Sequence, residues 1–222
     1  MVTSYQAMSS ANRARRSPRN WRLDYGDRSL DFVNSKWNRL KDQRETLCSA
    51  DDLMAWLRSK RLIDPRAARR WGIRLARSAA VRATVFRTAI DFREALYRLF
   101  RSIAVGEPSD RRDLAFVNRI LAASLGRPVL LTTRLRRLQL VYRPEEKPVP
   151  ALLGPIALAA ARLLAEGEPS RFHPCLNPRC GVVFFDRTRN RSRRWCHMLV
   201  CGSVLKMRRY RDRSRGARRA DR

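Results

Sequence analysis

The sequence predicts an α+β fold that is mainly α-helical, with a larger helical part followed by a small cysteine-rich part. Apolar residues recur every three or four positions through most of residues 49–166, which is the spacing of amphipathic helices. Within that stretch, residues 128–143 alternate between apolar and polar side chains, which predicts one β-hairpin. Four of the five cysteines lie between residues 175 and 201, where the composition also becomes strongly basic.

The N-terminal region begins with a basic segment and a first apolar element. Residues 1–22 contain five Arg and no acidic residue, and we expect them to form a disordered basic arm. Residues 25–35, YGDRSLDFVNS, form a short apolar element that is either a strand or a buried turn. From residue 23 to residue 167 the pattern predicts one helical domain that includes the hairpin.

Capping residues and prolines mark where the helices of this domain begin and end. Ser49 can cap a helix because Asp52 follows three residues later. Asp64 and Pro65 begin the next helix, with proline in the first turn, where its missing N–H costs nothing. Further helices are expected at 79–104, from Ser109 or Asp110 to 125, and at 151–166, the last one closing at Gly167 before a linker at 168–170.

The charge of the chain points to a polyanionic partner. The formal net charge is +29, and 44 of the 49 basic residues are Arg. A preference for Arg over Lys is typical of GC-rich genomes, but it leaves the charge unchanged and does not explain the shortage of acids. Residues 171–222 contain 16 basic and 3 acidic residues, so this short segment carries almost half of the excess. We therefore expect nucleic acid as the partner, ahead of acidic lipid.

The clustered cysteines form two pairs, Cys175 with Cys180 and Cys196 with Cys201, with 15 residues between the pairs. Two such pairs joined by a short connection suit a tetrahedral four-thiolate Zn²⁺ site. A body of about 30 residues cannot build a sufficient apolar core, so one structural Zn²⁺ is predicted to hold it together. The apolar residues 182–185 would form a short strand over the site. An iron–sulfur cluster and four unlinked thiols are the alternatives.

The other candidate ligands are expected to play supporting roles. His173 and His197 flank cysteines, and we interpret both as surface or supporting residues. Trp195 is expected to shield the metal, although it could also stack on bases. Cys48 stands alone and is expected to pack as a small apolar residue.

Basic residues fill the connection between the cysteine pairs and continue into a predicted helix that begins near Ser203. Arg can donate two hydrogen bonds to a phosphate or to the major-groove edge of guanine. The sequence therefore predicts a basic surface on a metal-fixed module. The residues expected to contact nucleic acid are Arg189, Arg191, Arg193, Arg194, Lys206, Arg208, Arg209 and Arg213.

The segment CLNPRCGVVFFDRTRNRSRRWCHMLVCG resembles the CGNR-type zinc finger of bacterial proteins. Upstream, SLDFVNS, LCSADDLMAWLRSKRLID and DFREALYRLF are similar to the N-terminal domain of that family, called ABATE. The resemblance covers about residues 23–213. It implies a transcription regulator linked to stress responses, with Cys175, Cys180, Cys196 and Cys201 as the zinc ligands.

This resemblance divides the chain into an ABATE-like domain at 23–167 and a finger with its basic helix at 171–215, followed by a disordered tail at 216–222. One departure concerns the signature itself, because Cys201-Gly202 is followed by Ser203 and Val204 in place of Asn and Arg. Ser203 can still cap a helix. Val204 removes a basic group, so the binding specificity of the family does not transfer.

The leading functional hypothesis is a transcription regulator whose finger binds DNA. The helical domain would sense a ligand or dimerise, so a small effector and a second copy of the chain are candidate partners. RNA binding is one alternative, and a zinc-stabilised interaction or ligand-binding protein without direct DNA contact is another. Catalysis is not expected, because the sequence offers no nucleophile–His arrangement, no open metal site and no phosphate-cradling glycine loop.

Arg93 interrupts the apolar face of the helix expected at 79–104 and needs an anionic partner. A structural ion pair is the favoured explanation, and a ligand pocket formed with Asp31 and Asn34 is the alternative. No membrane span is expected, because the longest apolar run, residues 151–161, falls short of the roughly 20 residues that a spanning helix needs. Without an export signal we expect a cytoplasmic bacterial protein with reduced thiols, which favours metal binding over disulfides.

Overall fold

The computed structural model describes residues 23–132, 137–143, 146–207 and 211. The predictions of disorder for 1–22 and 216–222 concern segments outside these residues. The helices are α2 (Arg28–Val33), α3 (Ala50–Ser59), α4 (Pro65–Ala76), α5 (Ala79–Val105), α6 (Arg111–Leu125) and α7 (Pro148–Glu166). A helix at Met198–Met207 ends the described chain, apart from residue 211. The predicted mainly helical α+β class is confirmed.

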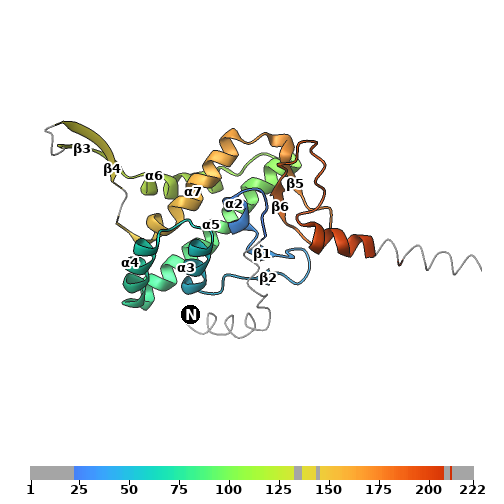
Figure 1. Ribbon diagram of the computed structural model, residues 1–222, viewed down its shortest axis with the longest axis horizontal. Coiled ribbons are helices and arrows are strands. Elements are labelled where there is room, and N and C mark those ends of the chain that lie inside the picture. The colour runs from blue at the N-terminus through green and yellow to red at the C-terminus, as the bar shows by residue number, and fades with distance from the viewer. Residues whose placement is uncertain (1–22, 133–136, 144–145, 208–210, 212–222) are drawn as a thin grey trace, which may run out of the picture.

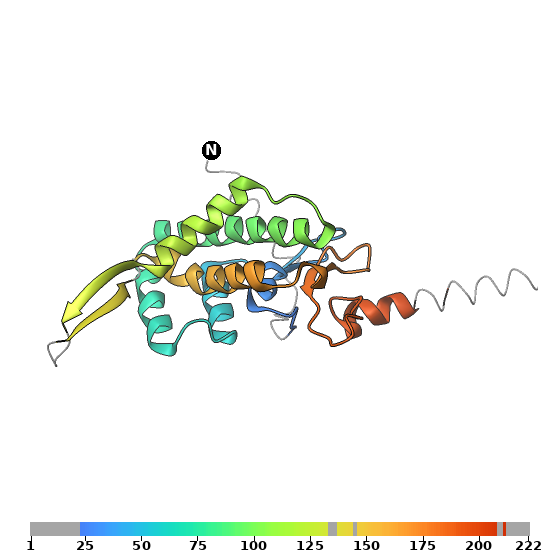
Figure 2. The ribbon, with the colours of Figure 1, turned by 90° about the horizontal axis from the view of Figure 1, so that it is seen from above.

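The strands pair only as two-stranded antiparallel ribbons within the described residues. They are β1 (Lys36–Trp37) with β2 (Arg44–Glu45), β3 (Arg127–Thr132) with β4 (Leu138–Arg143), and β5 (Phe172–Pro174) with β6 (Val183–Phe185). The second of these is the predicted hairpin, and it projects from one end of the molecule, opposite the cysteine-rich end (Figures 1 and 2). Leu130 and Leu138 on this hairpin are 63% and 69% exposed.

The predicted caps form at the predicted helix starts. Ser49 accepts a hydrogen bond from the N–H of Asp52, Asp64 accepts one from Ala67, and Asp110 caps α6. Gly106 ends α5 in the left-handed region, at φ 73°, as its predicted position requires. Helix α7 begins at Pro148, three residues earlier than expected, because proline at the first helical position gives up no hydrogen bond.

The prediction of a strand or buried turn at 25–35 is wrong, because residues 28–33 form helix α2. Asp27 caps this helix by accepting a hydrogen bond from the N–H of Ser29. Leu30, Phe32 and Val33 are completely buried, and Ser29 and Asp31 of the same helix are buried as well. A short helix that is buried all round shows no amphipathic period, so the sequence pattern could not identify it.

One continuous apolar core runs from the helical part into the cysteine-rich part. Helix α5 lies at its centre and packs against α2, α3, α4, α6, α7 and the β5–β6 ribbon (Figure 1). Phe172 of β5 lies between Phe100 of α5, with ring centroids 5.9 Å apart, and Phe185 of β6, at 5.0 Å. The sequence had indicated a separate small body that only an ion could hold together. The structure shows instead that this body shares the core of the helical domain.

Helix α7 is long and apolar enough to cross a membrane by length and composition alone, which the run at 151–161 did not suggest. Its packing accounts for this composition. Leu152, Leu153, Ile156 and Ala157 are completely buried, and α7 packs against α2, α5 and α6. We therefore regard α7 as a second core helix, packed beside α5.

Candidate metal centre

Four cysteine side chains converge at the end of the molecule opposite the hairpin. The Sγ atoms of Cys175, Cys180, Cys196 and Cys201 all lie within 4.8 Å of one another. Two of the separations are 3.7 Å, between Cys180 and Cys196, and 3.6 Å, between Cys196 and Cys201. A tetrahedral zinc site with Zn–S bonds of about 2.3 Å has sulfurs about 3.8 Å apart. The donor set therefore fits one structural Zn²⁺, which would cross-link the two loops.

Local backbone structure places each pair of cysteines. The N–H of Cys175 donates to the carbonyl of Val182 at 2.9 Å, and that of Cys180 donates to Asn177 at 2.9 Å, which closes the first loop. Cys201 lies in the first turn of the helix Met198–Met207, where its N–H bonds to the carbonyl of His197. The helix thus begins five residues before the predicted start at Ser203 and includes the proposed ligand Cys201.

Hydrogen bonds to sulfur support this arrangement. The N–H of Cys196 donates to Cys175 Sγ, and Asn177 Nδ2 donates to Cys201 Sγ, each at 3.4 Å. Such bonds orient thiolate ligands and stabilise their charge. Hydrogen bonding with Cys175, reinforced by burial, raises the pKa of the Cys180 and Cys196 thiols above the ordinary value. Four thiols this close cannot all ionise unless a cation neutralises them.

The metal loops are fastened to the helical domain by backbone contacts. The N–H of Arg39 donates to the carbonyl of Cys180 at 2.8 Å, and Tyr97 Oη donates to the carbonyl of Gly181 at 2.9 Å. Asn34 Nδ2 donates to the carbonyl of Val183 at 2.7 Å. Gly181 has φ +67°, and a Cβ there would lie 2.9 Å from Arg39 Cβ, so this position needs glycine. The position of the metal site is therefore fixed relative to the helical domain.

The residues beside the ligands have supporting positions, as the sequence indicated. The group of metal-binding side chains contains the four cysteines and no histidine among the described residues. Trp195 is half-buried and packs against the turn at Gly202, where a Cβ would lie 3.6 Å from its ring. Cys48 is half-buried at the start of α3 and is not part of the cysteine cluster.

The eight basic residues predicted to contact nucleic acid have different environments. Arg193 donates to the carbonyls of Trp195, Asp24 and Cys196 and lies 4.6 Å from the centre of the Phe184 ring. Its guanidinium therefore has a structural role that the sequence did not suggest. Arg191 pairs with Glu168 at 2.8 Å.

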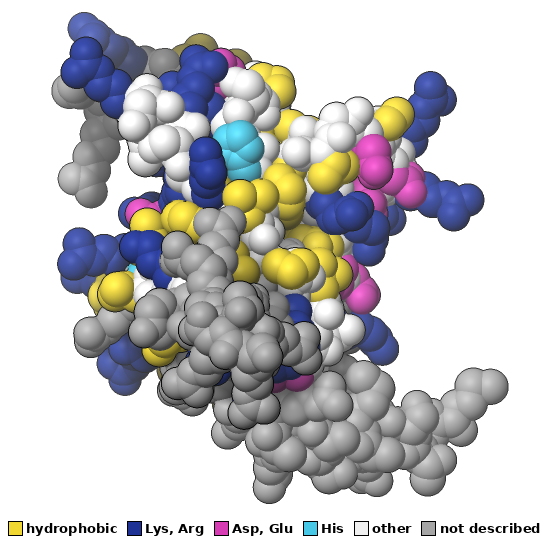
Figure 3. All heavy atoms as spheres, turned by 90° about the vertical axis from the view of Figure 1, so that its right-hand side faces the viewer, with side chains coloured by type: hydrophobic (Ala, Val, Ile, Leu, Met, Phe, Trp, Pro, Cys, Tyr) yellow, Lys and Arg dark blue, Asp and Glu magenta, His cyan; other side chains and the backbone are white. Residues whose placement is uncertain are grey.

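Three of the remaining six predicted contacts, Arg189, Arg194 and Lys206, are exposed and have no side-chain partner within the described part of the chain. Arg208, Arg209 and Arg213 lie outside the described residues. In a view of this end of the molecule, apolar side chains occupy the centre and Lys and Arg side chains lie around it (Figure 3). Within residues 171–207 the large apolar side chains that are exposed are Leu176, Met198, Leu199, Val204 and Met207.

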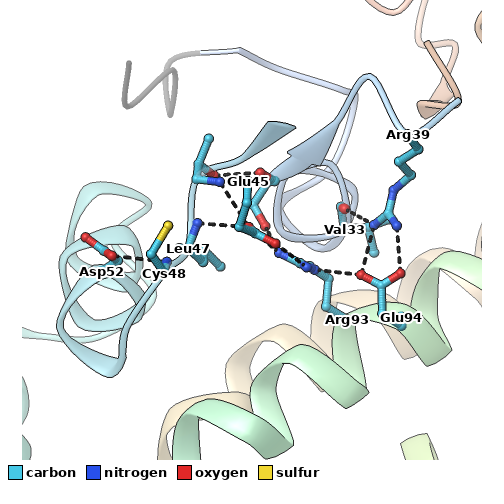
Figure 4. A network of polar contacts seen from close by, with 10 residues as sticks. Val33, Arg39, Glu45, Leu47, Cys48, Asp52, Arg93 and Glu94 are labelled. Carbon is cyan, nitrogen blue, oxygen red and sulfur yellow. Dashed lines mark hydrogen bonds and ion pairs between the residues drawn. The ribbon is translucent and has the colours of Figure 1, made fainter. Parts of the chain in front are cut away.

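Arg93 forms the structural ion pair that the sequence favoured, and its partner is Glu45 of β2. The side chain is 1% exposed and donates from Nη1 and Nη2 to the two Glu45 oxygens, both at 2.7 Å (Figure 4). It also donates to Glu94, which pairs with Arg39 at 2.6 Å. Asp31 pairs with Lys60 at 2.5 Å. The structure therefore does not bring Arg93 together with Asp31 and Asn34.

The local sequence around Glu45 gave no sign of its pairing with Arg93. It lies 48 residues before Arg93 on a two-residue strand, and it also accepts hydrogen bonds from the N–H groups of Thr46 and Leu47 at 3.0 Å. The one available signal was a buried Arg that required an acid, without any indication of which of the 20 acids would supply it.

Comparisons with known proteins agree with this geometry. Residues 26–167 match the family model ABATE, described as "Putative stress-induced transcription regulator". Residues 171–214 match the CGNR zinc finger model. No curated protein matches the chain significantly.

Proposed function

Because this chain belongs to the ABATE family and carries a CGNR zinc finger, we propose that it is a bacterial transcription regulator that binds DNA through the finger. In this proposal the helical domain binds an effector or dimerises, the protein acts in the cytoplasm on the nucleoid, and it catalyses no reaction. The description of the family supports a regulatory role, and the charge of +29 supports a polyanionic partner.

The observation that carries the proposal is the set of unpaired cations on the metal module. Arg189, Arg194 and Lys206 are exposed, and none has an acidic partner among the described residues. The connection that presents Arg189 and Arg194 and the helix that presents Lys206 meet at the four-cysteine cluster, and Arg39 and Tyr97 hold the start of that connection at Cys180 and Gly181. Cations on a fixed frame can meet phosphates without first being ordered, which lowers the entropic cost of binding.

A triple variant, Arg189→Ala with Arg194→Ala and Lys206→Ala, tests this proposal in the zinc-loaded full chain. Binding to duplex DNA, followed by fluorescence anisotropy over a range of salt concentrations, should weaken steeply with salt in the wild type. Each lost phosphate contact lowers the salt slope by about 0.9, so the variant should lose about 2.7 in slope.

A matched control removes the same charge at the other end of the molecule. Arg66, Arg69 and Arg77 are exposed on or just after α4, far from the metal module (Figure 1). Their replacement by Ala should change the slope much less than the finger variant does. Equal losses in the two variants would mean that only net charge matters and that the finger is not the binding surface.

Two observations favour a second candidate function, a zinc-stabilised interaction module without direct DNA contact. The helix Met198–Met207 exposes Leu199, Val204 and Met207, an apolar face that suits a protein partner better than a phosphate backbone. Val204 also replaces the basic residue of the family signature. If the finger is such an interaction module, the wild-type chain itself should show no measurable affinity for DNA. Competition between duplex DNA and RNA for the purified protein separates the RNA-binding alternative.

A further inference from the structure

An enclosed cavity of about 40 Å³ lies between the helical domain and the metal loops. Asp31, Asn34 and Trp37 line it from the helical side, and Cys180, His197 and Val200 line it from the metal side. Arg93 does not line it. The cavity is therefore a different site from the pocket that the sequence suggested, although it shares two of its residues.

Three polar atoms of the cavity lining are buried without a hydrogen-bond partner among the described residues: Asn34 Oδ1, Trp37 Nε1 and His197 Nδ1. Asn34 is 3% exposed, and its Nδ2 is already committed to the carbonyl of Val183. The Oδ1 atom is thus an acceptor that lacks a donor, while Trp37 Nε1 is a donor that lacks an acceptor. Buried groups of this kind are costly unless a ligand or water pairs with them.

The charged side chains on the helical side of the cavity already compensate each other, and the thiolate sulfurs of Cys180, Cys196 and Cys201 on the metal side disfavour an anion. Asp31 accepts from Lys60 at 2.5 Å and from the N–H of Tyr25 at 3.0 Å, and Lys60 also donates to the carbonyl of Leu23. A charged ligand would find no free countercharge here and would pay the full cost of losing its hydration. The electrostatics of the cavity therefore favour a neutral ligand.

The size and access of the cavity narrow the ligand further. A volume of 40 Å³ holds about three water molecules, whereas a cavity of about 150 Å³ holds a six-membered ring, so the ligand is limited to a planar group of about three or four non-hydrogen atoms. Tyr25, Trp37 and Trp56 provide aromatic walls that suit such a flat frame. Asp31 and Lys60 also line an open surface groove, so the Asp31–Lys60 pair separates the cavity from solvent.

We propose that this cavity binds a small neutral organic molecule that carries one hydrogen-bond donor and one acceptor on a compact frame. Trp37 Nε1 would donate to the acceptor of the ligand, and Asn34 Oδ1 would accept from its donor. Because the walls come from both parts of the chain, the ligand would stabilise the docking of the metal loops. This identifies the class of effector in the proposed function, although binding itself does not depend on DNA recognition.

The test uses two probes of this class, formamide and acetamide, with the zinc-loaded full chain. ¹H–¹⁵N NMR follows the indole N–H resonance of Trp37, identified by its absence in Trp37→Phe. Each probe should shift this resonance in a saturable way and slow the release of zinc to a chelator. Acetone has a carbonyl and the same number of non-hydrogen atoms as acetamide but no N–H, and it should bind about tenfold more weakly.

Trp37→Phe keeps an aromatic wall but removes the donor; the rate of zinc release, which does not depend on the Trp37 signal, should show that this variant binds acetamide about tenfold more weakly. Trp71→Phe, in the core at α4, is the matched control and should leave the affinity unchanged. If neither probe shifts the Trp37 resonance, the cavity holds only water and the proposal is refuted. Equal affinities for acetamide and acetone would also refute it, whether or not the variants fold. Since no nucleic acid is present, a chain that binds the probe but ignores DNA would refute only the proposed function.

Discussion

Replacing Glu45 by glutamine should destabilise the protein strongly, because it removes one of the two carboxylate charges that balance two buried Arg side chains. Arg39 and Arg93 share the carboxylates of Glu45 and Glu94, so the four groups are neutral together (Figure 4). Glu45→Gln keeps an acceptor for the N–H groups of Thr46 and Leu47 but leaves one guanidinium uncompensated.

Breaking a buried pair from one side costs about 3–5 kcal/mol. Glu45 is only 12% exposed, but Glu94 remains 3.1 Å from Arg93 Nε, so we expect the lower end, about 3 kcal/mol. Urea unfolding of the zinc-loaded chain, followed by circular dichroism, measures this loss if the urea dependence of the unfolding free energy is unchanged.

An exposed ion pair provides the control for this measurement. Asp51 pairs with Arg82 on the surface and is 73% exposed, so Asp51→Asn should cost less than about 1 kcal/mol. Adding Arg93→Met to Glu45→Gln should recover part of the lost stability, because no buried charge is then left unpaired. A loss for Glu45→Gln as small as that for Asp51→Asn would show that solvent screens the network and that the reasoning is wrong.

Three further predictions concern pH, metal and docking. Burial opposes ionisation of Glu94, but the hydrogen bond from Arg39 and the charges of Arg93 and Arg39 hold its pKa below the usual 4.5. The stability that Glu94 contributes is therefore full above about pH 4.5 and is lost as the pH falls through the folded-state pKa. An acid titration of the unfolding free energy should thus decline less steeply in Glu94→Gln, and an unchanged decline would contradict this assignment. Cys196→Ser should abolish stoichiometric zinc binding, yet hydrogen exchange should show residues 183–185 still protected, because β6 is held by the shared core; loss of that protection would favour a module held by the ion alone. Phe172→Ala should cost about 3–5 kcal/mol in the same urea assay and should speed zinc release, whereas a stability loss without faster release would mean that docking does not support the site.

Much of the fold could be predicted because its signals are local. Ser49, Asp64 and Asp110 mark helix starts with side chains that bond to the backbone two or three residues later, and Gly106 marks an end. The cysteine pairs could be recognised in the sequence for the same reason, because the two cysteines of each pair lie close together along the chain. Such features need no knowledge of the rest of the chain.

The features that could not be predicted depend on distant contacts. The partners of Arg193 and the pairing of Arg93 with Glu45 join residues far apart in sequence, and neither leaves a local pattern. Phe172 could be recognised as apolar, but its position against Phe100 depends on how the ribbon docks on α5. The cavity beside the metal loops exists only because these contacts bring two surfaces together.

The seating of Phe172 between Phe100 and Phe185 limits how this protein can be divided. The two family regions end at residue 167 and begin at residue 171, which makes that boundary an inviting place to cut. A finger expressed alone would carry Phe172 into water, and the complementary fragment would leave Phe100 bare, so each would tend to aggregate. A finger fused to a different helical domain would need an aromatic side chain there to pack against Phe172. The finger of this chain is therefore poorly suited to transfer between proteins.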